Sequence, residues 1–246
     1  MTLAHILLAT LAGGVLSVLA AALLSLTALR RWAPRLVGFS VGVLLAAALL
    51  DLLPEAAELL DPHRAGLVLL LGILLFFALE KTALWRHDHA HAGHAHPRHA
   101  PVGLMIVVGD GLHNFVDGVL IAAAFLQDTA LGVATATAVI AHEVPQEVGD
   151  FMVLLAAGYG RARALFMNLL SSLASVLGGL LGWATLQGAG DAIPYALALA
   201  AASFIYIAVA DLVPLLQQRR KPRDFAVQFT LLAGGVWVVM LGAHSH

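Results

Sequence analysis

Two polar motifs interrupt the apolar part of this sequence, and both contain side chains that ligate metal ions. The first reads HNFVDG over residues 113–118, and the second reads HEVPQE over residues 142–147. Because the chain contains no cysteine, thiolate sites and disulfides are excluded. A metal site must therefore use imidazole, carboxylate, amide or water ligands. This set suits divalent ions such as zinc, iron or manganese better than copper(I).

Helical spacing brings the polar side chains of the first motif together. Asp110, His113 and Asp117 recur at i, i+3 and i+7, so they share one helix face, and Asn114 lies beside them. A rise of about 1.5 Å per residue places His113 near the middle of a hydrocarbon core about 30 Å thick. The first motif is therefore expected at mid-depth of a membrane.

The second motif distributes its groups over two neighbouring helix faces. His142 and Gln146 lie at i and i+4 on one face. Glu143, Glu147 and Asp150 follow at i, i+4 and i+7 on the adjacent face. Counting residues from the opposite side of the membrane again gives mid-depth for His142.

Pro145 interrupts the hydrogen bonding of the helix that carries the second motif. Proline has no N–H, so the carbonyl of Ala141 loses its helical donor. A membrane tolerates such a break where it is packed against protein or lines a cavity.

The composition indicates that these helices lie in a bilayer. Hydrophobic residues make up 61% of the 246 residues and charged residues only 11%, against about 25% charged in soluble domains. The net charge of −2 gives no argument for nucleic acid as a partner. The first apolar run is too long for a signal-peptide core and lacks a charged start, so we expect a retained span. The prediction is an all-α polytopic membrane protein with one transmembrane domain over residues 1–246.

Hydropathy predicts eight membrane spans, each about 20 or more mainly apolar residues long. Twelve of the thirteen basic residues fall in or beside the gaps after the first, third, fifth and seventh spans, and only Arg64 lies on the other side. Positive charge favours the cytoplasmic side, so both termini are expected to be extracytoplasmic. The expected spans are 3–29, 36–60, 65–84, 102–126, 130–157, 163–187, 191–216 and 225–243.

An inverted repeat links the second and seventh expected spans. AALLDLLPEA over residues 47–56 and IAVADLVPLL over residues 207–216 share Asp-Leu-x-Pro late in an apolar helix. The two spans cross the membrane in opposite directions, and inverted repeats are typical of secondary transporters. The first three and last three spans would then flank a central pair.

The buried carboxylates need a compensating charge. Asp117, Glu143 and Glu147 have no Lys or Arg in either span, and a charge at the bilayer centre costs about 2.5–3.5 kcal/mol. A bound cation or protons must neutralise them. The alternatives are a hydrogen-bonded cluster or proton relay in a proton- or ligand-responsive membrane protein, and an intramembrane metalloprotease. The His-Glu-x-x-His pattern of zinc hydrolases has Gln146 in place of its second histidine, which argues against the protease.

Three further features have a functional and a simpler interpretation. Asp51 and Glu55 form either an entrance for cations or a hydrated interface, and Asp211 is a candidate for an exit path. The segment 85–101 is too polar to fold and predicts a cytoplasmic loop, either capturing metal or serving as a spacer. Its histidines are His87, His89, His91, His94, His96 and His99.

Together, HNFVDG, HEVPQEVGD, the histidine-rich segment and LLPEA over residues 52–56 resemble the ZIP (Zrt/Irt-like) family of metal transporters. The resemblance implies uptake of divalent ions into the cytoplasm across the plasma (inner) membrane. The ions are zinc, with iron, manganese, cobalt and cadmium as further candidates. It also implies a 3+2+3 helix arrangement, an elevator-like mechanism, frequent homodimers and no enzymatic activity.

By motif position, the resemblance implies a primary site from His113, Asp117, His142 and Gln146. It also implies a neighbouring, weaker second position at Asn114 and Glu143, with Asp117 as the bridging ligand. Many relatives have His or Glu at the position of Gln146. Some supply a glutamate from the sixth span, where residues 168–175 here contain none, so one well-held ion is expected. The candidate metal ligands are His113, Asn114, Asp117, His142, Glu143, Gln146 and Glu147, and the candidate pathway residues are Asp51, Glu55, Asp110, Asp150 and Asp211.

Overall fold

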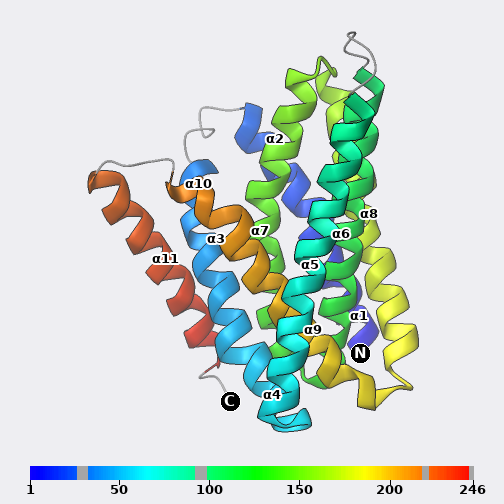
Figure 1. The fold of residues 1–246 in the computed structure, drawn as a ribbon, viewed down its shortest axis with the longest axis vertical. Helices are drawn as coiled ribbons and strands as arrows, with labels where there is room; N and C mark the ends of the chain where they lie inside the picture. The colour runs from blue at the N-terminus through cyan, green and yellow to red at the C-terminus, as the bar shows by residue number, and fades with distance from the viewer. Residues whose placement is uncertain (27–32, 92–98, 218–221, 244–246) are drawn as a thin grey trace.

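The protein is a bundle of long helices in a computed structural model that describes residues 1–26, 33–91, 99–217 and 222–243 (Figure 1). The helices form long, continuous rods, and several rods consist of two α-helices joined end to end through a wider, π-helical turn. In chain order the elements are α1 (Thr2–Leu11), η1 (Ala12–Leu16), α2 (Ser17–Leu26), α3 (Ala33–Ala46), η3 (Ala47–Leu52), α4 (Leu53–Leu60), α5 (Pro62–His91), α6 (His99–Gln127), α7 (Thr129–Ala156), α8 (Arg161–Leu186), η4 (Gly190–Ala192), α9 (Ile193–Tyr206), η5 (Ile207–Leu212), α10 (Val213–Gln217) and α11 (Pro222–Ala243).

Seven helical stretches among the described residues are long and apolar enough to cross a bilayer. They correspond to seven of the eight expected spans. The remaining rod, α7, is 28 residues long but less apolar, because the motif at 142–147 interrupts it. The helix with the lowest hydropathy is therefore the one that carries the polar motif at 142–147.

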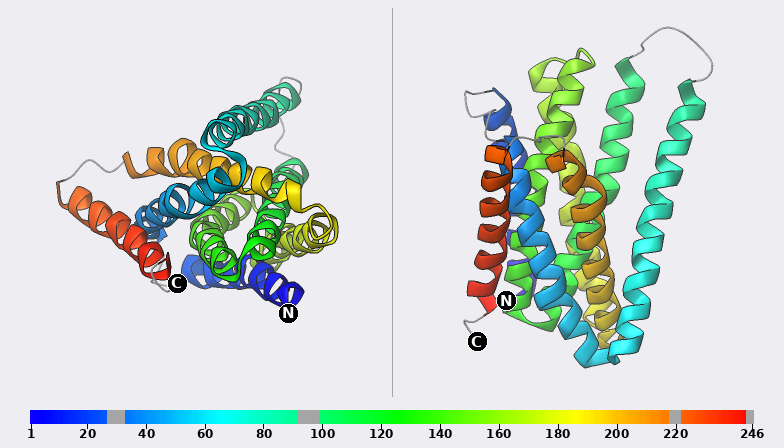
Figure 2. Two further views of the ribbon diagram at one scale, coloured as in Figure 1. Left: turned by 90° about the horizontal axis from the view of Figure 1, so that it is seen from below. Right: turned by 60° about the vertical axis from the view of Figure 1, so that its left-hand side comes forward.

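The described ends of the rods alternate between the two ends of the bundle. In Figures 1 and 2, α1 begins and α11 ends at the lower end, while α2, α5 and α7 end at the upper end. This alternation agrees with the expected pattern of gaps. The expected loop at 85–101 is shorter than predicted, because α5 continues to His91 and α6 begins at His99. Lengthening an existing helix avoids the cost of nucleating a new one, which explains the difference.

Both copies of the sequence repeat have the same backbone irregularity. The π-helical turns η3 and η5 each contain the aspartate of Asp-Leu-x-Pro and end two residues before the proline, which is Pro54 or Pro214. A proline ring clashes with the carbonyl four residues earlier, and a wider turn relieves that clash. The repeat is thus structural as well as sequential.

Helix contacts divide the bundle into two groups. In the first group, α6 packs along α8 and α7, α2 packs along α7, and α1 packs along α8. In the second, α3 packs against α11, and α9 packs against α5, α4 and η3. The groups meet mainly where α3 crosses α7 and α9 crosses α6 (Figure 2).

Glycines allow the closest approaches within each group. A Cβ on Gly178 of α8 would collide with the backbone carbonyl of Phe115 on α6, and one on Gly42 of α3 would collide with that of Leu232 on α11. Small residues at helix interfaces are the usual means of close packing in membranes. These glycines therefore serve contacts within the chain.

Candidate metal site

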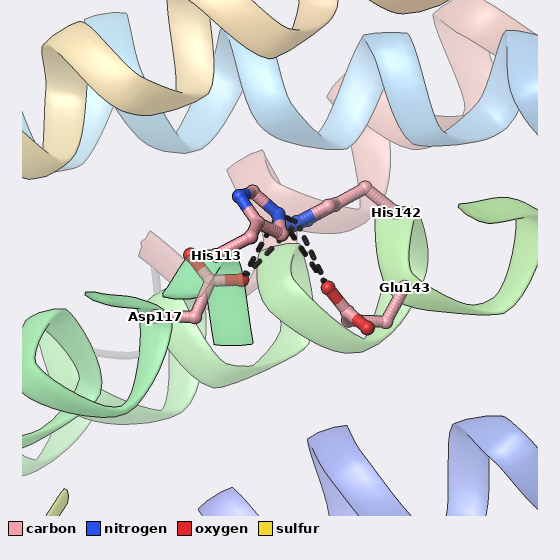
Figure 3. A group of neighbouring side chains, drawn as sticks. All are labelled: His113, Asp117, His142 and Glu143. Atoms are coloured by element: carbon pink, nitrogen blue, oxygen red, sulfur yellow. Dashed lines mark hydrogen bonds and ion pairs between the residues drawn. The ribbon is translucent and has the colours of Figure 1, made fainter. Parts of the chain in front are cut away.

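Four metal-ligating side chains converge between α6 and α7. Figure 3 shows His113 and Asp117 of α6 pointing toward His142 and Glu143 of α7. Asp117, His142 and Glu143 are fully buried, and only His113 keeps some exposure, with 22% of its side chain accessible. The group is enclosed by protein on all sides except near His113.

Five of the six separations among the four donor atoms are close to those of tetrahedral coordination. The two histidine Nε2 atoms are 3.2 Å apart, and Asp117 Oδ2 lies 3.6 Å from that of His113 and 3.3 Å from that of His142. Glu143 Oε1 lies 3.6 Å from each. A tetrahedral zinc ion with ligands at about 2.0–2.1 Å has ligand-to-ligand edges of about 3.3–3.4 Å. The donors thus surround a space of the size that zinc requires.

His142 is oriented for ligation by contacts on its other side. Its Nδ1 lies 2.9 Å from the carbonyl oxygen of Ala138, so an Nδ1–H donates there and the Nε2 lone pair faces the other donors. Metal-bound histidines usually have such a second contact, which fixes ring and tautomer. The ring also meets Phe204 of α9 edge-on, with centroids 6.0 Å apart. A residue of the second helix group thus packs against His142, a candidate ligand in the first group.

The neighbouring amides face Asp110 rather than the imidazoles. Asn114 Nδ2 lies 3.1 Å from Asp110 Oδ1 and 3.5 Å from Glu143 Oε2. Gln146 Nε2 lies 3.3 Å from the same Asp110 oxygen. Glu147 forms a separate group of carboxylates with Asp110 and Glu143. Glu143 therefore joins the two histidines and Asp117 in the group of donor atoms that could hold a metal ion, and Gln146 as a ligand stays a prediction.

Sequence reasoning did not identify Ser40, which supplies a hydrogen-bond donor to the carbonyl that Pro145 leaves without its helical partner. The Ser40 hydroxyl of α3 donates a hydrogen bond to the carbonyl of Ala141, the group that Pro145 leaves without a helical donor. Ser40 is fully buried, and its hydroxyl also lies 3.0 Å from the carbonyl of Leu36. This contact joins the two helix groups one residue before His142.

The expected entrance residues line a cavity at the end of the bundle where α1 begins. Asp51 and Glu55 border a cavity of about 660 Å³ together with Glu58 and Asp128. Gln127 Nε2, at the end of α6, donates to Glu55 Oε1 at 2.7 Å. The cavity is acidic and lies between α4, α7 and α11.

The remaining candidate residues are Asp150, Asp211 and the histidines of segment 85–101, and the structure describes the side chain of Asp150 alone among them. Asp150 is partly buried on α7, about one turn beyond Glu147. Asp211 lies in η5, and its side chain is outside the described part of the chain. The same holds for the side chains of His87, His89, His91 and His99, while His94 and His96 lie outside the described residues altogether.

One family model matches nearly the whole chain, and individual relatives match parts of it. A family model described as "ZIP Zinc transporter" matches residues 2–101 and 85–243. The human protein "Zinc transporter ZIP10" is 38% identical over 149 residues, which are 54% of this chain and 18% of that protein. "Zinc transporter ZIP13" of Pongo abelii is 32% identical over 222 residues, covering 84% of this chain and 66% of that protein.

A third relative has a broader name. The mouse protein "Metal cation symporter ZIP14" is 40% identical over 131 residues, covering 52% of this chain and 26% of its own length. The chain therefore spans between about a fifth and two thirds of the length of these relatives.

Proposed function

Because this chain belongs to the ZIP family of zinc transporters, we propose that it carries divalent metal ions across a membrane through the site between α6 and α7. Zinc is the first candidate, because two imidazoles and two carboxylates at tetrahedral spacing are a typical zinc donor set. The name of the mouse relative supports a wider range of ions, and we propose iron, manganese, cobalt and cadmium as further substrates.

The proposed path begins at the acidic cavity and leads to the cytoplasm. A hydrated cation is attracted by Asp51 and Glu55 and then exchanges its water for the four donors. Asp117 and Glu143 together balance the two charges of one zinc ion, so loading removes the cost of keeping them charged in the bilayer.

Movement of one helix group against the other gives the ion access to each side in turn. All four donors belong to α6 and α7, so the first group carries the ion as a unit. The second group contributes only supporting contacts, from Phe204 and Ser40. This division supports the elevator-like mechanism that the family resemblance implied.

We propose import across the plasma (inner) membrane with both chain ends extracytoplasmic. The support is the asymmetry of basic residues, twelve of which lie on one side. A homodimer is a further proposal from the family resemblance. Peptide hydrolysis is the weaker alternative, because the family model describes transporters and Gln146 replaces the second histidine of the zinc-hydrolase pattern.

Flux through reconstituted protein tests the proposal. Liposomes that contain a zinc-sensitive dye should show zinc uptake with the wild type and almost none with the double substitution His113→Ala and Asp117→Ala. A matched pair, His5→Ala and Asp191→Ala, removes the same residue types at exposed positions and should leave uptake unchanged. Equal uptake by the site variant and the wild type would show that the ion does not use this site.

A further inference from the structure

We propose that the hydroxyl of Thr135 is a transient ligand that passes the ion from the acidic cavity to His142 and speeds manganese more than zinc. Thr135 lies on α7 between these two places and is fully buried. The inference rests on the proposed function, because it assumes that an ion travels along this route.

One face of α7 connects the cavity with the candidate metal site. Leu131 and Ala134 line the cavity, and Thr135 follows directly after Ala134. Leu131, Thr135 and His142 recur at i, i+4 and i+11, which places them on one helix face. A rise of about 1.5 Å per residue puts Thr135 about 6 Å below Leu131 and about 10.5 Å above His142 along the helix axis. Ala138 completes this face, so its polar group before the histidine is the Thr135 hydroxyl.

This face of α7 meets the second helix group. The His142 ring contacts Phe204 of α9, and α7 packs against α3 and η3. Thr135 lies on the same side of α7 as His142, so it faces the boundary between the two groups. A route that opens when the groups move against each other therefore passes Thr135.

The Thr135 hydroxyl differs from those of four other threonines inside the helices. Each of the four donates to the carbonyl four residues earlier at 2.7–2.9 Å, and they are Thr10, Thr137, Thr185 and Thr230. Thr135 makes no hydrogen bond to a described residue, although it is fully buried. Buried polar groups normally have partners. The hydroxyl is therefore available to a ligand that does not belong to the helix.

A second oxygen without a partner lies on the cavity side of this route. Asp51 is in η3, which packs against α7, and it lines the cavity. Its Oδ2 is buried and makes no hydrogen bond within the described part of the chain. An ion that leaves the Asp51 carboxylate for the metal site therefore meets the Thr135 hydroxyl before it reaches His142.

A hydroxyl suits a transient ligand better than a second carboxylate would. Its oxygen has two lone pairs and can replace one water of a hydrated ion. It is neutral, so it holds the ion weakly, and a conducting site must release what it binds. Oxygen ligands suit manganese, whereas imidazole nitrogen suits zinc. Thr135 should therefore help manganese more than zinc on the way to the histidines.

Uptake of zinc and of manganese by reconstituted liposomes tests this role. Thr135→Val keeps the shape of the side chain and removes the hydroxyl, so the fold should be retained. Its zinc uptake rate should fall about three- to tenfold, the scale of one hydrogen-bonding oxygen. Thr135→Ser keeps a hydroxyl and should transport at close to the wild-type rate. Thr185→Val is the matched control, because the exposed Thr185 hydroxyl bonds to the Leu181 carbonyl within its own helix.

Two further measurements separate a ligand from a structural residue. The zinc affinity of the protein in detergent should be the same for Thr135→Val and the wild type, because the four donors of the candidate site are retained. The ratio of manganese to zinc uptake should fall about two- to threefold in Thr135→Val. A substitution that only slowed the helix movement would slow both ions by the same factor.

Three results would overturn this role of Thr135. They are wild-type zinc uptake by Thr135→Val, an equal slowing of zinc and manganese, and a Thr135→Ser variant as slow as Thr135→Val. Failure of the transport proposal is distinguishable from these, because the wild type would then take up no zinc, and both proposals would be wrong.

Discussion

The contact between Ser40 and Ala141 leads to a prediction that links backbone chemistry to helix packing. Replacing Ser40 with alanine removes the only side-chain donor described for the Ala141 carbonyl, which Pro145 has already deprived of its helical partner. A buried carbonyl without a donor costs about 1–3 kcal/mol, and side-chain hydrogen bonds measured in membranes are worth up to about 1.7 kcal/mol. Ser40→Ala should therefore lower the free energy of unfolding by about 1–2 kcal/mol.

A second substitution tests the cause. Pro145→Ala restores an N–H that can bond to Ala141, so Ser40→Ala in that background should cost less than about 0.5 kcal/mol, a clear coupling energy. Ser175→Ala is the matched control, since the buried Ser175 hydroxyl makes no hydrogen bond to a described residue. Reversible unfolding in mixed micelles gives the free energy of unfolding of Ser40→Ala, Pro145→Ala, the double variant and Ser175→Ala. Equal costs of Ser40→Ala in both backgrounds would refute the reasoning.

Two further predictions concern packing and ion access. Gly178→Ala should destabilise the protein by about 1–3 kcal/mol, because the new methyl group collides with the Phe115 carbonyl. Gly109→Ala, on the open face of α6 with nothing within 4 Å, should be neutral or stabilising by up to about 1 kcal/mol in the same unfolding assay. Asp51→Asn with Glu55→Gln should raise the KM for zinc about three- to tenfold at low salt and less at high salt, because the acidic cavity attracts cations. A KM that does not change would place the cavity off the ion path.

Periodicity and hydropathy predicted most of the fold. The expected spans match the helical rods closely, because a bilayer requires long apolar helices and leaves few alternatives. The Asp-Leu-x-Pro repeat identified two rods that share a π-helical turn, although the wider turn itself was not predicted. The helical extension of α5 into the histidine-rich segment was also missed. Composition alone does not show that adding residues to an existing helix avoids the cost of nucleation.

The candidate site was predictable where its residues lie on one helix or on two consecutive helices. Spacing brought His113 together with Asp117, and the short α6–α7 connection made this pair meet the second motif at His142 and Glu143. Spacing had paired His142 with Gln146, whose amide lies beside Asp110 in the structure. Contacts between distant segments were not predictable in this way. Ser40 lies 101 residues from Ala141 in the sequence, and nothing in its local pattern marks it as the donor.

X-ray absorption at the zinc edge, on protein loaded with one equivalent of zinc, tests the central claim most directly. Two imidazole nitrogens and two carboxylate oxygens at about 2.0–2.1 Å are expected, and His142→Ala should remove one imidazole from the spectrum. A spectrum without imidazole scattering, or one that His142→Ala leaves unchanged, would contradict a metal site between α6 and α7.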